Sequence, residues 1–466
     1  MSDLQRTFLR SKLSKLPPVP AFSEDEEEQA ELPSGEAFAQ PSTTASSSAG
    51  PSRHRQRNAE DFSPRTAEGY FEEALEVDVP SRSGGSISFR VYYTLPNPKA
   101  SAPLGPPAAE PSMKDVDINL NSPSLPTLRP GVGLPVTDDQ DEGGAQPTAP
   151  AANPGTLFVF HHGAGFSALS YALTAAEIAK MTAGEVGVLA YDCRGHGRTR
   201  TSNMSTDPLD MSIDTLSSDL TSLLSTMFPK TEEMPSLVLV GHSMGGSVVV
   251  SAAHALSSRG YNRIAGVAVL DVVEGTAMDA LSVMRSVVLS HPSGFSSVED
   301  AIRWHVDSKT IANVSSARIS VPPLLQPNPA YRPSCATAKE EEEPQEILSS
   351  SSASPTESQE GKEHALKWKA NLLATEPFWR GWFEGLSSRF LSVRTARLLL
   401  LAGTDRLDKE LMIGQMQGKY QLEVIADVGH SLHEDAPERT AKVLVDFWRR
   451  NERLNLPVRV KKVGES

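Results

Sequence analysis

The sequence predicts an α/β fold in which a mostly parallel central sheet is flanked by helices. Short apolar runs at 157–160, 187–191 and 264–270 are typical of strands that are buried on both faces. Segments with helical spacing separate these runs along the chain. Such alternation is typical of parallel strands that are joined through helices.

Composition divides the 466 residues into one folded region and several segments that we expect to be disordered. The disordered segments are a tail at 1–60 and inserts at 96–154 and 326–362. They are rich in Pro, Ser, Ala and acidic residues, so they cannot bury enough apolar surface to offset the entropy of the chain. A C-terminal tail at 451–466 follows the folded region. The sequence therefore predicts a single domain over 61–450.

Charge, cysteine content and missing motifs exclude several classes of protein. The net charge of −14 argues against nucleic acid as the main partner. Two cysteines are too few for a disulfide framework, and no segment has the apolar length of a membrane span or signal peptide. We therefore expect a cytoplasmic or nuclear protein, although its basic N-terminus leaves an organelle-targeting peptide as an alternative. No zinc-type spacing or nucleotide-binding motif is present, so neither a metal nor a cofactor is expected.

The first expected strand spans 86–93, where apolar residues alternate on one face. The next expected strand, 157–160, is followed by a glycine-rich run at 161–165. Such a turn can present backbone N–H groups to a ligand oxygen, and Ala164 would supply one of them. An ordinary strand-to-helix turn is the alternative. We expect His161 and His162 to pack or to form hydrogen bonds within this loop.

A helix over 170–181 and a strand over 187–191 follow, and the strand ends at Asp192. We interpret Asp192 as a structural brace of its loop and not as a catalytic acid. Apolar residues at helical spacing then predict a helix over 213–227 that faces the core.

The strongest signal of chemistry is the segment 237–247. Four apolar residues predict a buried strand, Gly-His-Ser-Met-Gly at 241–245 matches G-x-S-x-G, and a helix follows. A strand, a sharp turn and a helix form the nucleophile elbow, which exposes the serine hydroxyl at the head of the helix. We therefore expect Ser243 to be a nucleophile and the N–H of Met244 to face the same space.

Two acidic residues could complete a catalytic triad. Asp271 follows the strand 264–270, and Asp405 follows the strand predicted over 398–401. His430 lies in the loop after the last strand and could act as the general base. The order Ser, acid, His is that of α/β-hydrolases. We expect the neighbouring His433 to be a helix-start or surface residue.

Between the strands at 264–270 and 398–401, residues 276–395 interrupt the alternation and predict a lid. Its expected helices span 277–289, 298–308 and 366–388. At their spacing, Trp379 and Trp382 favour a place in the core of the lid over a place in a ligand platform.

Several longer motifs resemble the protein phosphatase methylesterase family. They are Asp271-Val-Val-Glu-Gly275, Gly381-Trp-Phe-Glu-Gly-Leu-Ser387, Leu398-Leu-Leu-Leu-Ala-Gly-Thr-Asp-Arg-Leu-Asp408, Ile413-Gly-Gln-Met-Gln-Gly418 and Gly429-His-Ser-Leu-His-Glu-Asp-Ala-Pro437. Asp61-Phe-Ser-Pro64 and Tyr70-Phe71 resemble the N-terminal lead-in of the family.

The resemblance implies an α/β-hydrolase fold and a serine esterase. Its substrate and partner would be the catalytic subunit of protein phosphatase 2A, from whose C-terminal leucine it would remove a methyl ester. The resemblance also assigns the catalytic acid to Asp271. Ala164 and Phe166 depart from the usual glycine-rich run of the family, as does Gly195 from a common serine.

Two other functions compete with the methylesterase. One is a generalist esterase for small esters, against which the long lid motifs argue. The other is a binding protein on an inactive hydrolase scaffold, against which the retained Ser243, Asp271 and His430 argue.

Overall fold

The computed structural model describes residues 61–81, 85–98, 154–202, 210–331, 364–403 and 407–452. Both predicted tails lie outside these residues, apart from 451–452, which continue the last helix. So do 99–153 and 332–363, which make up nearly all of the two predicted inserts. The second candidate acid, Asp405, also lies outside the described residues.

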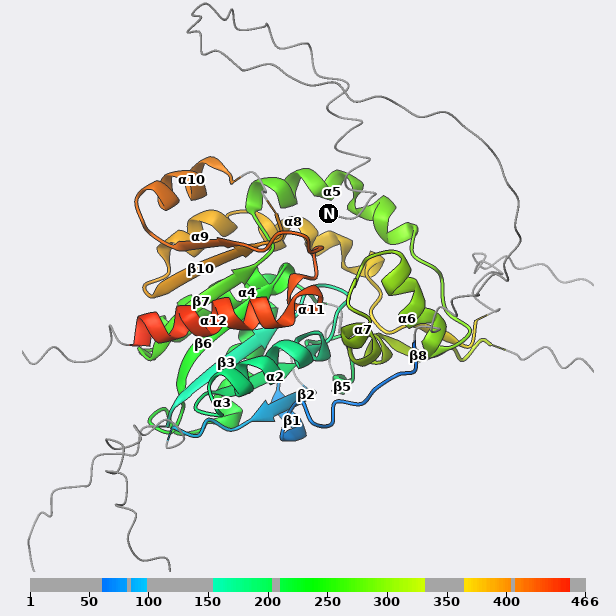
Figure 1. Cartoon of the computed structure of the whole chain (residues 1–466), viewed down its shortest axis with the longest axis horizontal. Helices are drawn as coiled ribbons and strands as arrows, with labels where there is room; N and C mark the ends of the chain where they lie inside the picture. Colours follow the sequence, from blue (N-terminus) through cyan, green and yellow to red (C-terminus); the bar gives the residue numbers. More distant parts are fainter. Residues whose placement is uncertain are drawn as a thin grey trace, which may run out of the picture.

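Nine strands of the described chain form one sheet with the order β1-β2-β4-β3-β6-β7-β10-β11, and β5 pairs with β2 (Figure 1). The strands are β1 Glu73–Pro80, β2 Ser86–Thr94, β3 Thr156–His161, β4 Gly187–Tyr191, β5 Arg200–Ser202, β6 Ser236–His242, β7 Ile264–Leu270, β10 Ala396–Leu401 and β11 Gln421–Val424. β2 is antiparallel to β1, β4 and β5, and the pairs from β4 to β11 are parallel. The predicted mostly parallel sheet is confirmed.

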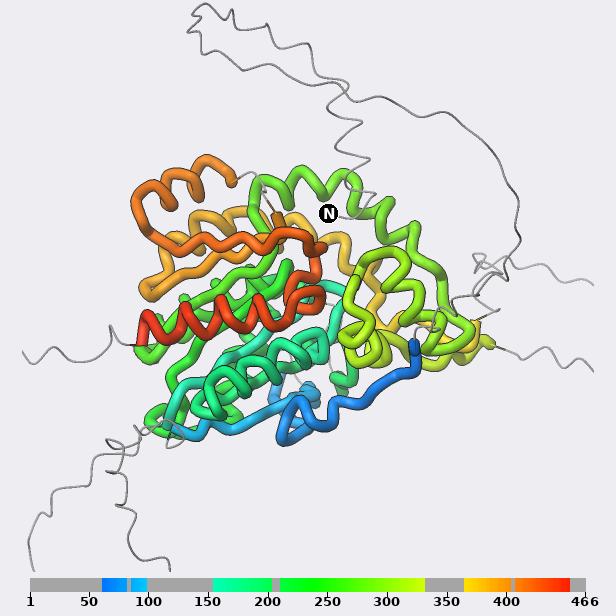
Figure 2. The backbone as a smooth tube through the Cα atoms, viewed as in Figure 1, coloured from blue at the N-terminus to red at the C-terminus, as the bar shows by residue number. Residues whose placement is uncertain are grey.

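Side chains alternate between the two faces of the buried strands. In β3, Leu157 and Val159 pack on one face with α3 (Ile213–Met227) and α4 (Met244–Ser258). Phe158 and Phe160 pack on the other face with α2 (Ala172–Met181) and α12 (Pro437–Glu452). Figure 2 shows α12 running alongside α2. This period of two explains why the strands read as continuous apolar runs.

A separate small apolar core holds what we call the cap, which consists of four elements. These are α6 (Val298–Asp307), α7 (Val314–Ser320), β8 (Leu325–Pro327) and β9 (Leu366–Trp368). Phe295, Ile302 and Ile311 are buried within this core, and Trp368 packs against it. The cap lies at the end of the molecule where α11 (Leu432–Asp435) joins the sheet domain (Figure 1).

The rest of the predicted lid packs differently. α5 (Glu274–Leu289) has no fully buried residue, whereas α8 (Trp379–Phe383) and α9 (Leu386–Ser392) belong to the core of the sheet on the side of α4. Trp379 and Trp382 are both buried there, so they pack in a core as predicted, but it is the core of the sheet domain and not a core of the lid. We propose that α6 to β9 form the cap proper and that α8 and α9 belong to the sheet domain.

The single helix predicted over 366–388 is wrong. The segment forms β9, a 3₁₀ helix at Leu373–Phe378, α8 and α9. Pro377 lies within the 3₁₀ helix, and Gly385 has a φ of +75° where α9 begins. A proline lacks an N–H and a left-handed residue turns the chain, so neither continues an α-helix.

The first described residues tie the cap to the sheet domain. Ser63 accepts hydrogen bonds from the Arg318 side chain at its carbonyl (2.6 Å) and at its hydroxyl (2.7 Å). Asp61 forms an ion pair with the same guanidinium at 2.7 Å. This segment leads directly into β1, so the cap is attached to the sheet from a side that does not involve α11.

Three further short elements complete the description. A 3₁₀ helix at Ala168–Tyr171 precedes α2, another at Pro322–Leu324 follows α7, and α10 spans Lys409–Met416 between β10 and β11. None of the helices in the described ranges combines the length and the apolar character needed to cross a bilayer.

Candidate active site

Ser243 lies in a sharp turn between β6 and α4, as the elbow motif predicts. Its φ of +53° is in the left-handed region that few non-glycine residues occupy. A Cβ on Gly241 would lie 2.1 Å from the carbonyl oxygen of Gly245, and one on Gly245 would lie 2.3 Å from that of His161. Both glycines are therefore required for the close approach of backbone that holds the turn.

The glycine-rich loop after β3 lies against this turn. A Cβ on Gly163 would come within 3.3 Å of the Cβ of Ser243. The next residue, Ala164, is partly buried, and Met244 opens α4. No hydrogen bond between described residues uses the N–H of Ala164 or of Met244. The structure thus brings the two predicted donors to the neighbourhood of Ser243.

Asp271 also has a positive φ, +52°, and follows the last residue of β7. Its Oδ2 lies 2.7 Å from Nδ1 of His430, and its Oδ1 accepts a hydrogen bond of 2.7 Å from the N–H of Ala402. Ala402 begins the loop that leads to Asp405. The loop that follows β10 therefore contributes a backbone donor to Asp271.

His430 lies in the loop between β11 and α11. Its side chain is 43% exposed, against 9% for Asp271, so the ring is accessible to solvent whereas the acid is largely buried. The carbonyl of His430 accepts a hydrogen bond of 2.9 Å from Nε2 of His242. Burial lowers the pKa of His242 well below its usual value, so this ring is neutral and carries its proton on Nε2.

His433 is the residue whose environment the sequence reasoning missed. It lies within α11, as a helix-start residue would, but it is completely buried. Its ring stacks on Tyr171 with centroids 4.4 Å apart and lies 4.6 Å from the ring of His242. Burial lowers the pKa of His433 to about 3. Tyr171 and His433 are far apart in the sequence, so no local pattern could have indicated this contact.

His161 and His162, at the start of the glycine-rich run, are structural, as predicted. The Nδ1 atoms of His161 and His162 bond the carbonyls of His162 and Gly163, each at 2.8 Å. His162 also accepts the N–H of Cys193 at Nε2. Over the described ranges, no group of three or more His, Cys, Asp or Glu side chains could hold a metal ion.

Asp192 braces the loop after β4. Its two carboxylate oxygens accept the N–H groups of Ala168 and Arg198, each at 2.8 Å. Burial raises the pKa of this carboxyl to about 6. These contacts match the predicted structural role.

Comparison with known proteins identifies the fold and the family. The model of the alpha/beta hydrolase family matches residues 158–443. A Cryptococcus neoformans protein named protein phosphatase methylesterase 1 is 43% identical over the whole length of both chains. An Aspergillus fumigatus protein of the same name is 38% identical over 99% of this chain and 92% of its own.

The chain belongs to the protein phosphatase methylesterase family. A relative of the same name from Gibberella zeae is 47% identical over 66% of this chain and 69% of its own. The expected α/β-hydrolase fold is therefore confirmed, and the protein is a hydrolase of the methylesterase class.

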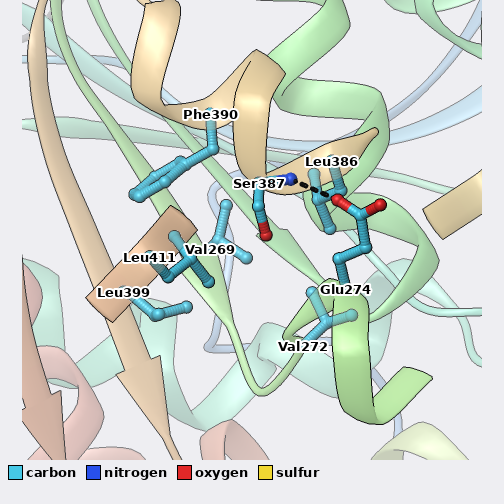
Figure 3. Close-up of a pocket in the computed structure, with 8 residues that line it drawn as sticks. All are labelled: Val269, Val272, Glu274, Leu386, Ser387, Phe390, Leu399 and Leu411. Carbon is cyan, nitrogen blue, oxygen red and sulfur yellow. Dashed lines mark hydrogen bonds between the residues drawn. The ribbon is translucent and has the colours of Figure 1, made fainter. Parts of the chain in front are cut away.

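Three of the motifs that resemble the methylesterase family meet beside the acid loop. Glu274, three residues after Asp271, accepts the N–H groups of Gly385 and Ser387 at 2.8 and 2.9 Å. Figure 3 shows its carboxylate directed at the first turn of α9, over a small cavity. The hydroxyl of Ser387 in turn donates to Asp408, which caps α10 through the N–H of Leu411. The motifs thus join the loop of Asp271 to α9 and α10.

Proposed function

We propose that this methylesterase removes the methyl ester from the C-terminal leucine of the catalytic subunit of protein phosphatase 2A. Ser243 is the nucleophile, His430 the general base and acid, and Asp271 the residue that orients His430. The observation that carries the proposal is the 2.7 Å contact between Asp271 and His430 on the same edge of the sheet as the strained turn of Ser243.

The reaction follows from these roles. His430 takes the hydroxyl proton as the oxygen of Ser243 attacks the ester carbonyl, and the N–H groups of Ala164 and Met244 bind the oxyanion. The tetrahedral intermediate then collapses. The methoxy oxygen takes the proton from His430 as its bond to the carbonyl carbon breaks, and methanol leaves. His430 then takes a proton from water as the water oxygen attacks the leucyl acyl-enzyme. The bond to Oγ of Ser243 breaks, His430 returns the proton to that oxygen, and the free carboxylate is released.

Recognition must come from the acyl side, because methanol offers almost no surface to bind. Trp379 and Trp382 are buried, so neither can contact a partner directly. α5, which begins three residues after Asp271, exposes Val287 and Leu289 by 45% and 58%. We assign the docking of the folded phosphatase to exposed side chains of this kind, whose binding energy orients the ester.

We also propose the cellular compartment in which the reaction takes place. Cys193 is a buried free thiol, and a reduced cysteine is usual in cytoplasmic and nuclear proteins. We therefore assign the reaction to the cytoplasm, the nucleus or both.

The decisive experiment measures methyl release from methylated phosphatase by the wild type and by Ser243→Ala. Loss of the nucleophile should lower the rate by about 10⁴-fold or more. The control is thermal unfolding, which should be nearly the same for both proteins. Activity of Ser243→Ala near that of the wild type would refute the assignment of the nucleophile.

A second comparison separates the methylesterase from a generalist esterase. Catalytic efficiency should be far higher on the intact methylated phosphatase than on a free methylated tail peptide, because the peptide lacks the docking surface. Equal efficiency on both would favour the generalist esterase.

A further inference from the structure

One carboxylate joins the loop of His430 to the cap. Oδ2 of Asp435, the last residue of α11, accepts the N–H of Gly429 at 2.8 Å. Its Oδ1 accepts the N–H of Ala312 at 2.7 Å. Gly429 immediately precedes His430, and Ala312 lies in the cap loop between α6 and α7. Each oxygen of the side chain is therefore used for a different loop.

The loop of His430, residues 425–431, follows the end of β11. Its first two residues are tied to neighbouring elements, since the N–H of Ile425 donates to the carbonyl of Leu401 at 2.8 Å and the carbonyl of Ala426 accepts a hydrogen bond of 3.0 Å from Arg439. Asp427 has a φ of +63°. The cap loop also approaches closely, because a Cβ on Gly429 would lie 3.1 Å from Asp435 and 3.6 Å from the carbonyl oxygen of Lys309. A small residue is thus enclosed between the carboxylate and the cap.

His430 is also held by two other residues. Asp271 bonds its Nδ1, and its carbonyl oxygen accepts a hydrogen bond from Nε2 of His242, whose ring centroid lies 4.5 Å from that of His430. The N–H of Gly429 belongs to the residue immediately before His430, and Asp435 is its partner.

We propose that Asp435 is a positioning residue, which holds the backbone before His430 in register with the cap so that Nε2 faces Ser243. This role rests on the proposed function, since it requires His430 to be the general base. A carboxylate that accepts two backbone N–H groups forms stronger bonds when it is ionised than a neutral acceptor would. Burial raises the pKa of the Asp435 carboxyl, and the hydrogen bonds from Gly429 and Ala312 act in the opposite direction. A displacement of about 1 Å of a catalytic group can cost about a hundredfold in rate.

A neighbouring contact provides a matched control. Glu434 accepts a hydrogen bond of 2.8 Å from the hydroxyl of Ser316 in α7, and both side chains are buried. Burial raises the pKa of Glu434 to about 8. This bond also joins α11 to the cap, but it does not involve the loop of His430. Ser316→Ala therefore weakens the same interface without releasing Gly429.

The experiment compares Asp435→Asn with Ser316→Ala in the full chain, on the small ester p-nitrophenyl acetate. Asparagine keeps the size of the side chain, but its NH₂ group would face one of the two N–H donors. We expect Asp435→Asn to lower kcat about tenfold to a hundredfold with KM within about twofold of wild type. Ser316→Ala should keep kcat within about twofold of wild type, even if its melting temperature falls by as much as that of Asp435→Asn.

Two results would overturn the proposal. One is a kcat of Asp435→Asn that matches the wild type, and the other is an equal loss of kcat in Ser316→Ala. If Asp435→Asn does not fold, hydrogen exchange on the wild type decides instead. The amides of Gly429 and Ala312 should be protected together, and exchange of Gly429 at the rate of a free amide would contradict the role.

Two further variants separate this proposal from the proposed function. Ser243→Ala and His430→Ala should both abolish turnover of the same ester. If they do so while Asp435→Asn is unaffected, only the positioning role fails. If they retain turnover, the assignment of the catalytic residues fails.

Discussion

Backbone strain at single residues is concentrated around the site. Five non-glycine residues of the described ranges have positive φ, and four of them are Ser243, Asp271, Lys309 and Asp427. The first two are the proposed nucleophile and acid, and the other two lie in the cap loop and in the loop of His430. Such conformations cost free energy and persist where the surrounding structure enforces them.

The residue-scale prediction concerns the acid. Asp271→Asn should lower kcat on the methylated phosphatase by about 10⁴-fold, because the amide cannot support a protonated His430 and favours the wrong tautomer. Oδ1 can still accept the N–H of Ala402, so we expect the fold to survive. The measurement is steady-state kinetics together with thermal unfolding.

Asp405→Asn is the matched control for that variant, and it should retain most of the activity. A severe loss in Asp405→Asn together with a mild one in Asp271→Asn would show that the loop after β10 supplies the acid.

At the scale of elements, the turn between β6 and α4 depends on contact between backbones. A Cβ on Gly245 would lie 2.3 Å and 2.7 Å from the carbonyl oxygens of His161 and His162. These oxygens belong to the end of β3 and its loop, so neither can move without disturbing the central sheet. Interiors of this density do not absorb an added methyl group without rearrangement.

Gly245→Ala should therefore abolish activity and lower stability by about 1–3 kcal/mol, the usual cost of overpacking. Gly381→Ala is the control, because a Cβ there meets open space within α8. An alanine in a helix is favoured over glycine by about 1 kcal/mol, so this variant should be neutral or slightly more stable. Urea unfolding and ester turnover measure both, and an active, stable Gly245→Ala would contradict the described elbow.

Local sequence patterns predicted the helices and strands whose structure they determine on their own. The strand 264–270 and the helix 213–227 have the predicted bounds, because a continuous apolar run and a helical stripe each determine one local structure. β1 was not predicted, although Leu75, Val77 and Val79 alternate with acidic residues at the period of a strand. The segment after 366 could not be assigned from periodicity, since its apolar residues serve two different cores.

The site was predictable in part for a similar reason. Ser243, Asp271 and His430 each follow a strand, so the sequence predicts that they share the carboxyl edge of the sheet. The contacts of Asp435 and the burial of His433 depend on segments that are distant along the chain. Sequence spacing carries no information about such contacts.

For the whole molecule, buried histidines determine the response to acid. Burial lowers the pKa of His161 to about 4, of His305 to about 4 and of His433 to about 3, and it also lowers the pKa values of His162, His196, His242 and His291. The unfolded chain, with ordinary pKa values near 6.5, binds more protons than the folded chain at mildly acidic pH. The stability from these groups is therefore present above pH 6.5 and is lost as the pH falls toward 3.

Five carboxyl groups of the described residues act in the opposite direction. Burial raises the pKa of Glu434 to about 8 and of Asp192 to about 6, and it also raises the pKa values of Asp219, Asp435 and Glu452. Their contribution is present below their unfolded pKa values and is lost as the pH rises through the folded values. The seven histidines outnumber these acids, so the melting temperature should be highest near neutral pH and should fall steadily below about pH 6.

Differential scanning fluorimetry between pH 4.5 and 8 at constant ionic strength tests this expectation. His433→Phe is the informative variant, because it keeps the stacking on Tyr171 and removes a group that takes up a proton on unfolding. Each such group contributes about 1.4 kcal/mol for every pH unit between its two pKa values. The variant should have a shallower acid limb, and an unchanged melting temperature between pH 7 and 5 in the wild type would contradict the argument.

The strand order has a consequence for how the protein is made. From β3 onward, the strands β6, β7, β10 and β11 are each added beside the previous one in the order of the chain. As a ribosome releases the chain from its N-terminus, each new strand of this half of the sheet finds its partner already synthesised. Ser243 emerges in the middle of this process, whereas His430 follows the final strand. A nascent chain that has not yet reached residue 430 therefore contains the proposed nucleophile without the proposed base, and it cannot complete the proposed triad.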